Sequence, residues 1–185
     1  MKLTVHVGAL ALLTILLCGC MDAHKEDNSN TSSQTTTITI TANSISDYGT
    51  SWSLQDKIAV VENNRAIATA TVSTLKGDGR AEFSVAMTKD STLSGFCYDA
   101  IYPAEAVTES VDEGVVMATL SPDQRPLRGT FDRESFIMLA ERATSQSQPH
   151  QMDIYFSPIV AIGALQLSGL GEECYIEEIR LEACG

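Results

Sequence analysis

The chain's clearest candidate for chemistry is a pair of thiols near its N-terminus, in Cys18-Gly19-Cys20. They directly follow Met1-Lys2 and an uncharged apolar run over residues 7–17. A short positive end, an apolar stretch and a small residue at the cut define an export signal. A thiol just after the cut can carry a diacylglyceryl group, so we predict a lipoprotein signal peptide over residues 1–19 and lipid attachment at Cys20. The alternative is an ordinary secretory peptide in which Cys20 is incidental.

After Cys20 the sequence shows no recognisable set of catalytic residues. The predicted mature chain has only two histidines, His24 and His150, and neither stands beside a nucleophile motif. Cys97 lies inside an apolar run, which favours a packed thiol over an activated thiolate. Carboxylates are abundant, but a glycosidase needs two that converge on a cleft, and sequence does not show convergence. We therefore predict a protein that is not an enzyme and uses no cofactor.

The remaining cysteines are Cys97, Cys174 and Cys184. An exported disulfide framework normally has an even number of closely spaced cysteines, and three is odd. We predict a buried thiol at Cys97 and an optional bridge between Cys174 and Cys184. No CxxC pair or histidine cluster accompanies them, so we expect no metal site.

Aromatic side chains are the other candidates for recognition. Trp52 is the only tryptophan and stands just before a predicted strand. If exposed, it could form a stacking platform for a sugar ring together with Tyr48 or Tyr102. The alternative is a ring packed over the end of the fold with its N–H hydrogen-bonded, which is the commoner state of tryptophan.

Composition limits the partners. The chain has 12 basic and 24 acidic residues, a net charge of −12, and no cluster of lysine and arginine. Nucleic acid is excluded as a partner because phosphate binding needs clustered cations. Contact with a membrane should run through the acyl chains on Cys20, since an acidic surface is repelled by anionic lipid head groups.

The elements that would position these residues are short strands. Residues 20–34 are polar and predict a disordered tether, and residues 35–185 are long enough for one domain with a core. Residues 35–41 alternate threonine and isoleucine, which is a strand pattern. The segment 159–167 fits either a strand or a buried helix. With no long amphipathic helix, the pattern predicts an all-β antiparallel sandwich or barrel. The predicted strands are residues 35–41, 57–61, 66–72, 80–85, 95–102, 115–120, 136–140, 152–156, 159–167 and 175–182.

Several motifs, taken in order, resemble the fimbrillin-like proteins of the Bacteroidales. They are Trp52-Ser-Leu-Gln-Asp-Lys-Ile58, Gly79-Arg-Ala-Glu-Phe83, Tyr98-Asp-Ala-Ile-Tyr-Pro103, Pro122-Asp-Gln124, Phe131-Asp132, residues 136–140 and Ile176-Glu-Glu-Ile-Arg-Leu181. Gln55 stands where the family usually has glycine. The resemblance implies a transthyretin-like, Greek-key β-sandwich, a lipidated precursor at the outer membrane and assembly into fimbriae by strand exchange.

The chain also departs from that family. Family members usually continue into a second β domain, and their maturation cuts after an arginine, whereas no arginine occurs here before Arg65. Lys25-Glu26-Asp27 resembles a tag for export to the cell surface, although a plain soluble linker has the same composition.

Two functions follow as hypotheses. The first is a non-enzymatic, lipid-anchored structural or adhesive fimbrial subunit or accessory (anchor) subunit, whose strand at residues 35–41 is mobile and leaves a groove for another subunit. The alternative is a surface glycan-binding lipoprotein that contacts host or bacterial glycans or proteins through Trp52, Tyr48 or Tyr102.

Overall fold

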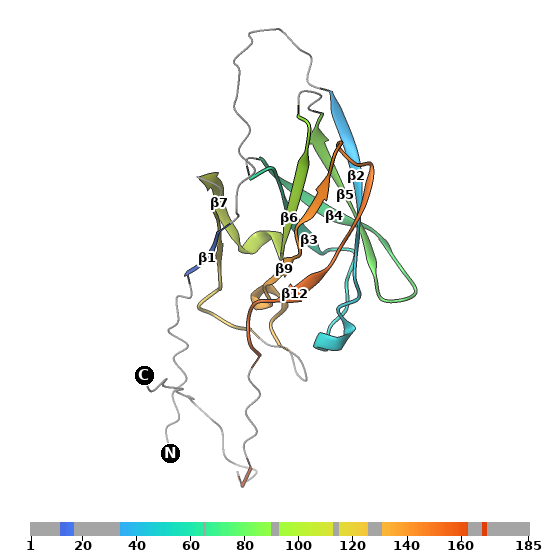
Figure 1. Ribbon diagram of the computed structural model, residues 1–185. Coiled ribbons are helices and arrows are strands. Elements are labelled where there is room, and N and C mark those ends of the chain that lie inside the picture. Colours follow the sequence, from blue (N-terminus) through green and yellow to red (C-terminus); the bar gives the residue numbers. More distant parts are fainter. Residues whose placement is uncertain are drawn as a thin grey trace.

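The computed structural model describes residues 12–16, 34–64, 66–89, 93–112, 115–125, 131–162 and 168–169 (Figure 1). Within these residues the chain forms strands and three 3-10 helices of one turn each, with no α-helix. The predicted all-β class is therefore confirmed. In the same residues, no helix has the length and apolar character needed to cross a membrane.

The strands are short and follow one another closely along the chain. Three 3-10 helices, η1 (Ser46–Tyr48), η2 (Ala104–Ala106) and η3 (Arg133–Ser135), lie in the connections. The strands are β1 (Leu12–Leu16), β2 (Thr35–Ala42), β3 (Lys57–Glu62), β4 (Ala66–Leu75), β5 (Ala81–Thr88), β6 (Phe96–Tyr102), β7 (Val107–Asp112), β8 (Val115–Thr119), β9 (Met138–Ala140), β10 (Ala143–Ser145), β11 (Gln151–Ile154) and β12 (Phe156–Pro158).

One large sheet makes up the body of the protein. Its strands are hydrogen-bonded in the order β11-β2-β5-β4-β3-β6-β9-β12, and β10 pairs with β6 beside this path. All these pairs are antiparallel except β11 with β2. The two ends of the path, β11 and β12, are separated in sequence only by Tyr155, so the sheet is nearly closed. The sandwich and Greek-key parts of the prediction are not confirmed, because the strands of the large sheet follow one path that nearly closes on itself, and β1, β8 and β7 form a separate three-stranded sheet.

The inside of this sheet holds the main core. Along β5 the side chains alternate strictly between buried and more exposed, as expected of a strand with one face on the core. Burying a large apolar side chain of this kind contributes about 1.5–3 kcal/mol. The largest buried members are Tyr98, Phe83, Phe156, Ile38, Ile40, Ile45, Ile58 and Met138.

A second core covers the outer face of β3 and β6. All seven residues of β6 are buried, which requires packing on both faces of the strand. Val61 and Ile101 point to the outer side, where they meet Val116 and Ala118 of β8 and Ile137. The hairpin of β7 and β8 therefore forms a second layer over the middle of the large sheet.

The predicted strand at residues 35–41 is confirmed, and it lies inside the large sheet. As β2 it pairs with β11 on one side and with β5 on the other, and Ile38 and Ile40 are in the core. This pairing describes one state of the chain, and the prediction that this strand is released for exchange stays a prediction. Residues 159–162 are not a strand, and residues 163–167 and 175–182 lie outside the described part of the chain.

Candidate functional site

Strand β8 has a neighbour that comes from the predicted signal peptide. On one side it pairs with β7, and on the other it pairs with β1, antiparallel, in the register Leu12 with Thr119 through Leu16 with Val115. The β1 ladder runs through all five residues without a break, whereas the register with β7 shifts twice. The more regular of the two ladders of β8 is thus the one made with β1.

Packing against the large sheet also holds β8. Val116 and Ala118 are fully buried in the second core, against Val61 and Ile101 of the large sheet. Since alternate residues of a strand point to opposite faces, these two side chains fix the orientation of the β8 backbone. The edge that faces β1 is therefore presented in one defined register.

The sequence of β8 lacks the usual protection of an edge strand. Free edges are commonly blunted by charged side chains or proline, since they otherwise pair with other chains. β8 reads Val-Val-Met-Ala-Thr, with neither. By contrast, the sequence of β7 contains Glu109 and Asp112, and β11 contains Asp153. The β1-facing edge of β8 is therefore the candidate functional site, and its function would be strand pairing.

The aromatic residues proposed as a stacking platform are placed elsewhere. Trp52 is 5% exposed and its Nε1–H donates to the Asn43 carbonyl at 2.8 Å. Its ring meets Phe83, Tyr102 and Phe156 edge-on, with centroids 5.2, 5.2 and 5.6 Å away. Trp52 is thus a core residue with its N–H hydrogen-bonded, which is the alternative to an exposed stacking platform.

The stacking prediction is likewise wrong for Tyr102, whose ring is 3% exposed. Tyr48 is half-buried and packs on the main core, with its ring centroid 6.1 Å from that of Phe136. These three rings therefore offer no shared exposed face to a ligand.

A polar network that the sequence did not indicate surrounds the Tyr102 hydroxyl. This hydroxyl donates to Asp56 Oδ1 at 3.2 Å, and Arg133 Nη2 donates both to Asp56 Oδ2 at 2.6 Å and to the Tyr102 hydroxyl at 3.2 Å. The Ser53 backbone N–H also donates to Asp56, at 2.7 Å. The three side chains come from segments far apart in the sequence, so no local pattern announces them. Their effect is to tie the loop before β3 to η3.

Burial makes this network sensitive to alkaline pH. Burial, and next the charge of Asp56, raise the pKa of Tyr102 from 10.0 to about 12, although Arg133 opposes the shift. Below pH 10 the folded and unfolded chains both keep the phenol neutral, so its stabilising effect is complete. Above pH 10 the unfolded chain loses the proton first, and we expect the free energy of unfolding to fall as the pH rises towards 12. Urea unfolding at a series of alkaline pH values checks this.

Tyr155→Phe is the control for this prediction, because Tyr155 is exposed and has no part in the network. It should leave the alkaline loss of stability unchanged. Equal stability of the wild-type chain at pH 10 and pH 12 would contradict the prediction.

The other predicted residues are placed as follows. Cys97 is buried, as predicted. His150 is exposed, and its backbone carbonyl accepts from the Thr39 N–H at 2.9 Å. Among the described residues, no three His, Cys, Asp or Glu side chains form a group able to hold a metal ion. Cys20, Cys174 and Cys184 lie outside the described residues, so the lipid site and the optional bridge stay predictions.

Comparisons with protein-family models, with curated proteins and with solved structures gave no match to this chain. The resemblance to fimbrillin-like proteins therefore depends on the sequence motifs alone.

Proposed function

We propose that this chain is a non-enzymatic, lipid-anchored protein of the outer membrane, exposed at the cell surface. In this proposal it is a fimbrillin-like structural or adhesive subunit, or an accessory (anchor) subunit, and it accepts a strand from another subunit along β8. The observation that carries the proposal is the pairing of β8 with residues of the predicted signal peptide.

The proposed sequence of events follows from the position of the cut. Cleavage before Cys20 removes β1, and with it the partner of one edge of β8. The edge of β8 then loses the ladder that it makes with β1, and the strand has no charge or proline to discourage pairing. An extended segment of another subunit can replace β1, with main-chain hydrogen bonds providing affinity. The acyl chains on Cys20 and the tether over residues 20–34 would meanwhile hold the module at the membrane.

The alternative is a glycan-binding surface lipoprotein. Its predicted stacking platform is absent, because Trp52 and Tyr102 are core residues. We therefore prefer strand addition as the main function.

Strand addition is testable with a chain that begins at residue 20 and carries Cys20→Ser, so that it is soluble and lacks β1. The probe is a peptide with the sequence of residues 10–17 and lysines appended for solubility. We expect it to bind and to raise the melting temperature, because it restores the missing ladder. We also expect the shortened chain alone to self-associate as its concentration rises, measured by analytical ultracentrifugation, and the full-length chain to stay monomeric.

Backbone N-methylation supplies a matched pair of control peptides. In an antiparallel ladder alternate residues direct their N–H groups toward the partner strand. Two peptides N-methylated at alternate sets of positions have the same side chains, but only one of them loses the N–H groups that face β8. That peptide should bind at least about tenfold more weakly, and the other should keep its affinity. Equal binding of both peptides, or none by the unmodified peptide, would refute strand addition at β8.

A further inference from the structure

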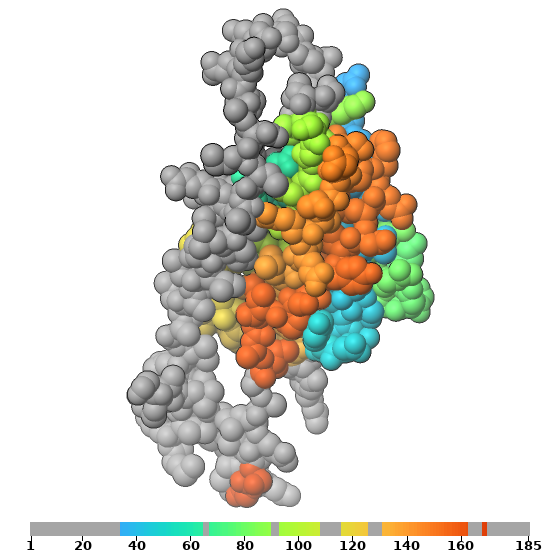
Figure 2. Space-filling view, viewed as in Figure 1, coloured from blue at the N-terminus to red at the C-terminus, as the bar shows by residue number. Residues whose placement is uncertain are grey.

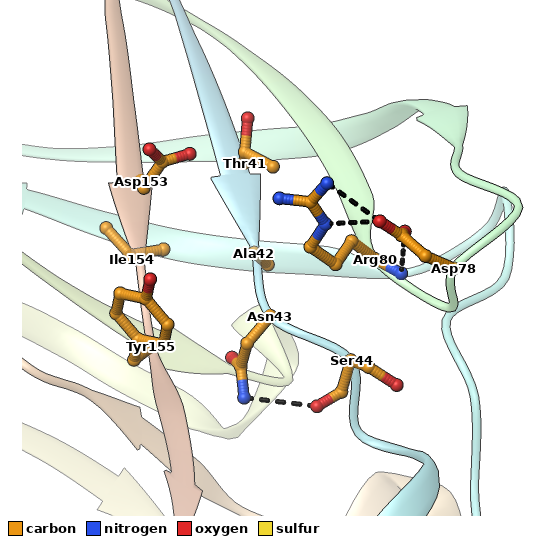
Figure 3. A pocket seen from close by; sticks show the side chains of 9 residues that line it. All are labelled: Thr41, Ala42, Asn43, Ser44, Asp78, Arg80, Asp153, Ile154 and Tyr155. Atoms are coloured by element: carbon orange, nitrogen blue, oxygen red, sulfur yellow. Dashed lines mark hydrogen bonds and ion pairs between the residues drawn. The ribbon is translucent and has the colours of Figure 1, made fainter.

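A small hollow opens on the outer surface where three segments meet. Its walls come from the end of β2, the turn between β4 and β5, and β11 with Tyr155 (Figure 3). Figure 2 shows the turn between β4 and β5, in green, beside the β11 segment, in orange, on the right of the molecule. The hollow has a volume of about 240 Å³, and it is lined by Thr41, Ala42, Asn43, Ser44, Asp78, Arg80, Asp153, Ile154 and Tyr155.

Three polar groups in this hollow have unused binding capacity. Thr41 is 7% exposed, yet no described residue hydrogen-bonds its hydroxyl. The Asp153 carboxylate has no partner among the described residues either. Arg80 uses Nε and Nη2 on Asp78, at 2.7 Å each, which leaves its Nη1 available.

Tyr155 adds an apolar surface beside these groups. It is 60% exposed, and it follows Asp153 by two positions, with the buried Ile154 between them. Since successive side chains of an extended segment alternate, the carboxylate and the ring both lie on the outer side. The parallel register places Asp153 beside Thr41. An acceptor, a hydroxyl and an aromatic ring are thus brought together from two neighbouring strands.

The walls of the hollow are rigid. Asn43 accepts from the Phe156 N–H at 2.7 Å, donates to the Phe156 carbonyl at 3.3 Å, and gives its own N–H to the Ile154 carbonyl at 3.2 Å. Gly79 has a φ of +82°, and a Cβ at that position would lie 2.7 Å from Ser44 Oγ. The turn therefore packs tightly against the end of β2. A ligand would meet a preformed surface, which lowers the entropic cost of binding.

The charges of the turn persist at neutral pH. The Arg80 backbone N–H, and then its guanidinium, lower the pKa of Asp78 below the usual value. Asp78 therefore stays ionised and keeps Arg80 oriented on the wall of the hollow, with the guanidinium drawn on the side that faces β2 (Figure 3).

We infer that this hollow binds one pyranose ring of a glycan. Each sugar hydroxyl both donates and accepts, so it can donate to Asp153, accept from Arg80, and do either with Thr41. The Tyr155 ring offers an apolar face to the C–H side of the sugar. A volume of about 240 Å³ is below the range typical of drug-sized ligands, which suits a single ring.

Other ligand classes fit the hollow less well. An anion would be repelled by Asp153 and Asp78. A lysine or arginine side chain could pair with Asp153, but it carries no acceptor, so it would leave Arg80 Nη1 without a partner. A neutral ligand rich in hydroxyl groups satisfies both signs of charge at once. This inference does not depend on strand addition, because β8 takes no part in lining the hollow.

The test is a titration of the ¹⁵N-labelled full-length chain with a panel of neutral methyl pyranosides, followed by amide chemical shifts. We expect saturable shifts for residues 41–44, 78–80 and 153–155 with at least one sugar of the panel. Tyr155→Ala and Asp153→Ala should each weaken that binding by at least about tenfold, and Tyr155→Phe should keep it because the ring is retained. Thr41→Val, which removes only the hydroxyl, should weaken it by about threefold to tenfold.

The controls decide between a specific site and general surface contact. Leu54→Ala removes an equally exposed apolar side chain outside the hollow and should leave sugar binding unchanged. Acetyl-lysine amide with a free ε-ammonium group is the cationic probe. The inference is overturned if no sugar shifts these amides, if the Tyr155→Ala chain binds as well as wild type, or if the cationic probe binds and the sugars do not.

Discussion

Replacing Trp52 with alanine is expected to lower the free energy of unfolding by about 3–5 kcal/mol, one of the two largest losses we predict. The ring contacts Phe83, Tyr102 and Phe156, so its removal leaves a cavity that these rigid aromatic neighbours cannot fill. The Asn43 carbonyl also loses its hydrogen bond from the indole N–H. Urea unfolding followed by circular dichroism gives the change in midpoint.

Leu54→Ala is the matched control for this core variant. Leu54 is two positions away in sequence and 61% exposed, so its truncation should change the free energy of unfolding by less than about 0.5 kcal/mol. If Trp52→Ala were as mild as Leu54→Ala, Trp52 would not be a core residue, and the exposed platform would need to be reconsidered.

Replacing Arg142 with alanine should cost a comparable amount, about 3–5 kcal/mol, because it leaves a buried charge unpaired. The Asp99 side chain is only 6% exposed. Arg142 donates hydrogen bonds to it, from Nε to Oδ1 at 3.0 Å and from Nη2 to Oδ2 at 2.8 Å. Arg142 Nη2 also donates to Asn64 at 3.2 Å. The same urea assay measures the loss.

The exposed pair of Arg80 and Asp78 is the natural comparison. Both side chains are 51% exposed, so Arg80→Ala should lower the free energy of unfolding by no more than about 1 kcal/mol. A second test replaces both buried partners, as Asp99→Leu with Arg142→Met, which should recover much of the loss since no charge is left buried. Equal effects of Arg142→Ala and Arg80→Ala would show that Asp99 reaches solvent in solution.

Much of the strand content was predictable because it depends on neighbours in the sequence. The alternation in residues 35–41 predicted β2, and the pair Asn63-Asn64 predicted the turn after β3, where both asparagines adopt positive φ. Pro103 correctly marked the end of β6. β7 was not predicted, because its sequence, Val-Thr-Glu-Ser-Val-Asp, has no clear apolar face.

The candidate sites were much less predictable. Trp52 has the same sequence context whether its ring is exposed or buried, and only the meeting of Phe83, Tyr102 and Phe156 decides it. Tyr155 was not predicted as a binding residue. It lies within a predicted strand, and the sequence does not show whether its side chain faces the core or the solvent. The hollow joins residues near 41, 79 and 154, which no local pattern connects.

The sequence by itself determined the all-β class, most strand positions and the predicted lipid signal, because each depends on periodicity or composition within about ten residues. Only the tertiary structure decided which strands pair, that β2 is interior and that β8 pairs with β1. The physical reason is that backbone hydrogen-bonding groups are the same in every strand. The choice of partner therefore depends on burial shared between distant segments, as with Val116 and Ala118 against Val61 and Ile101.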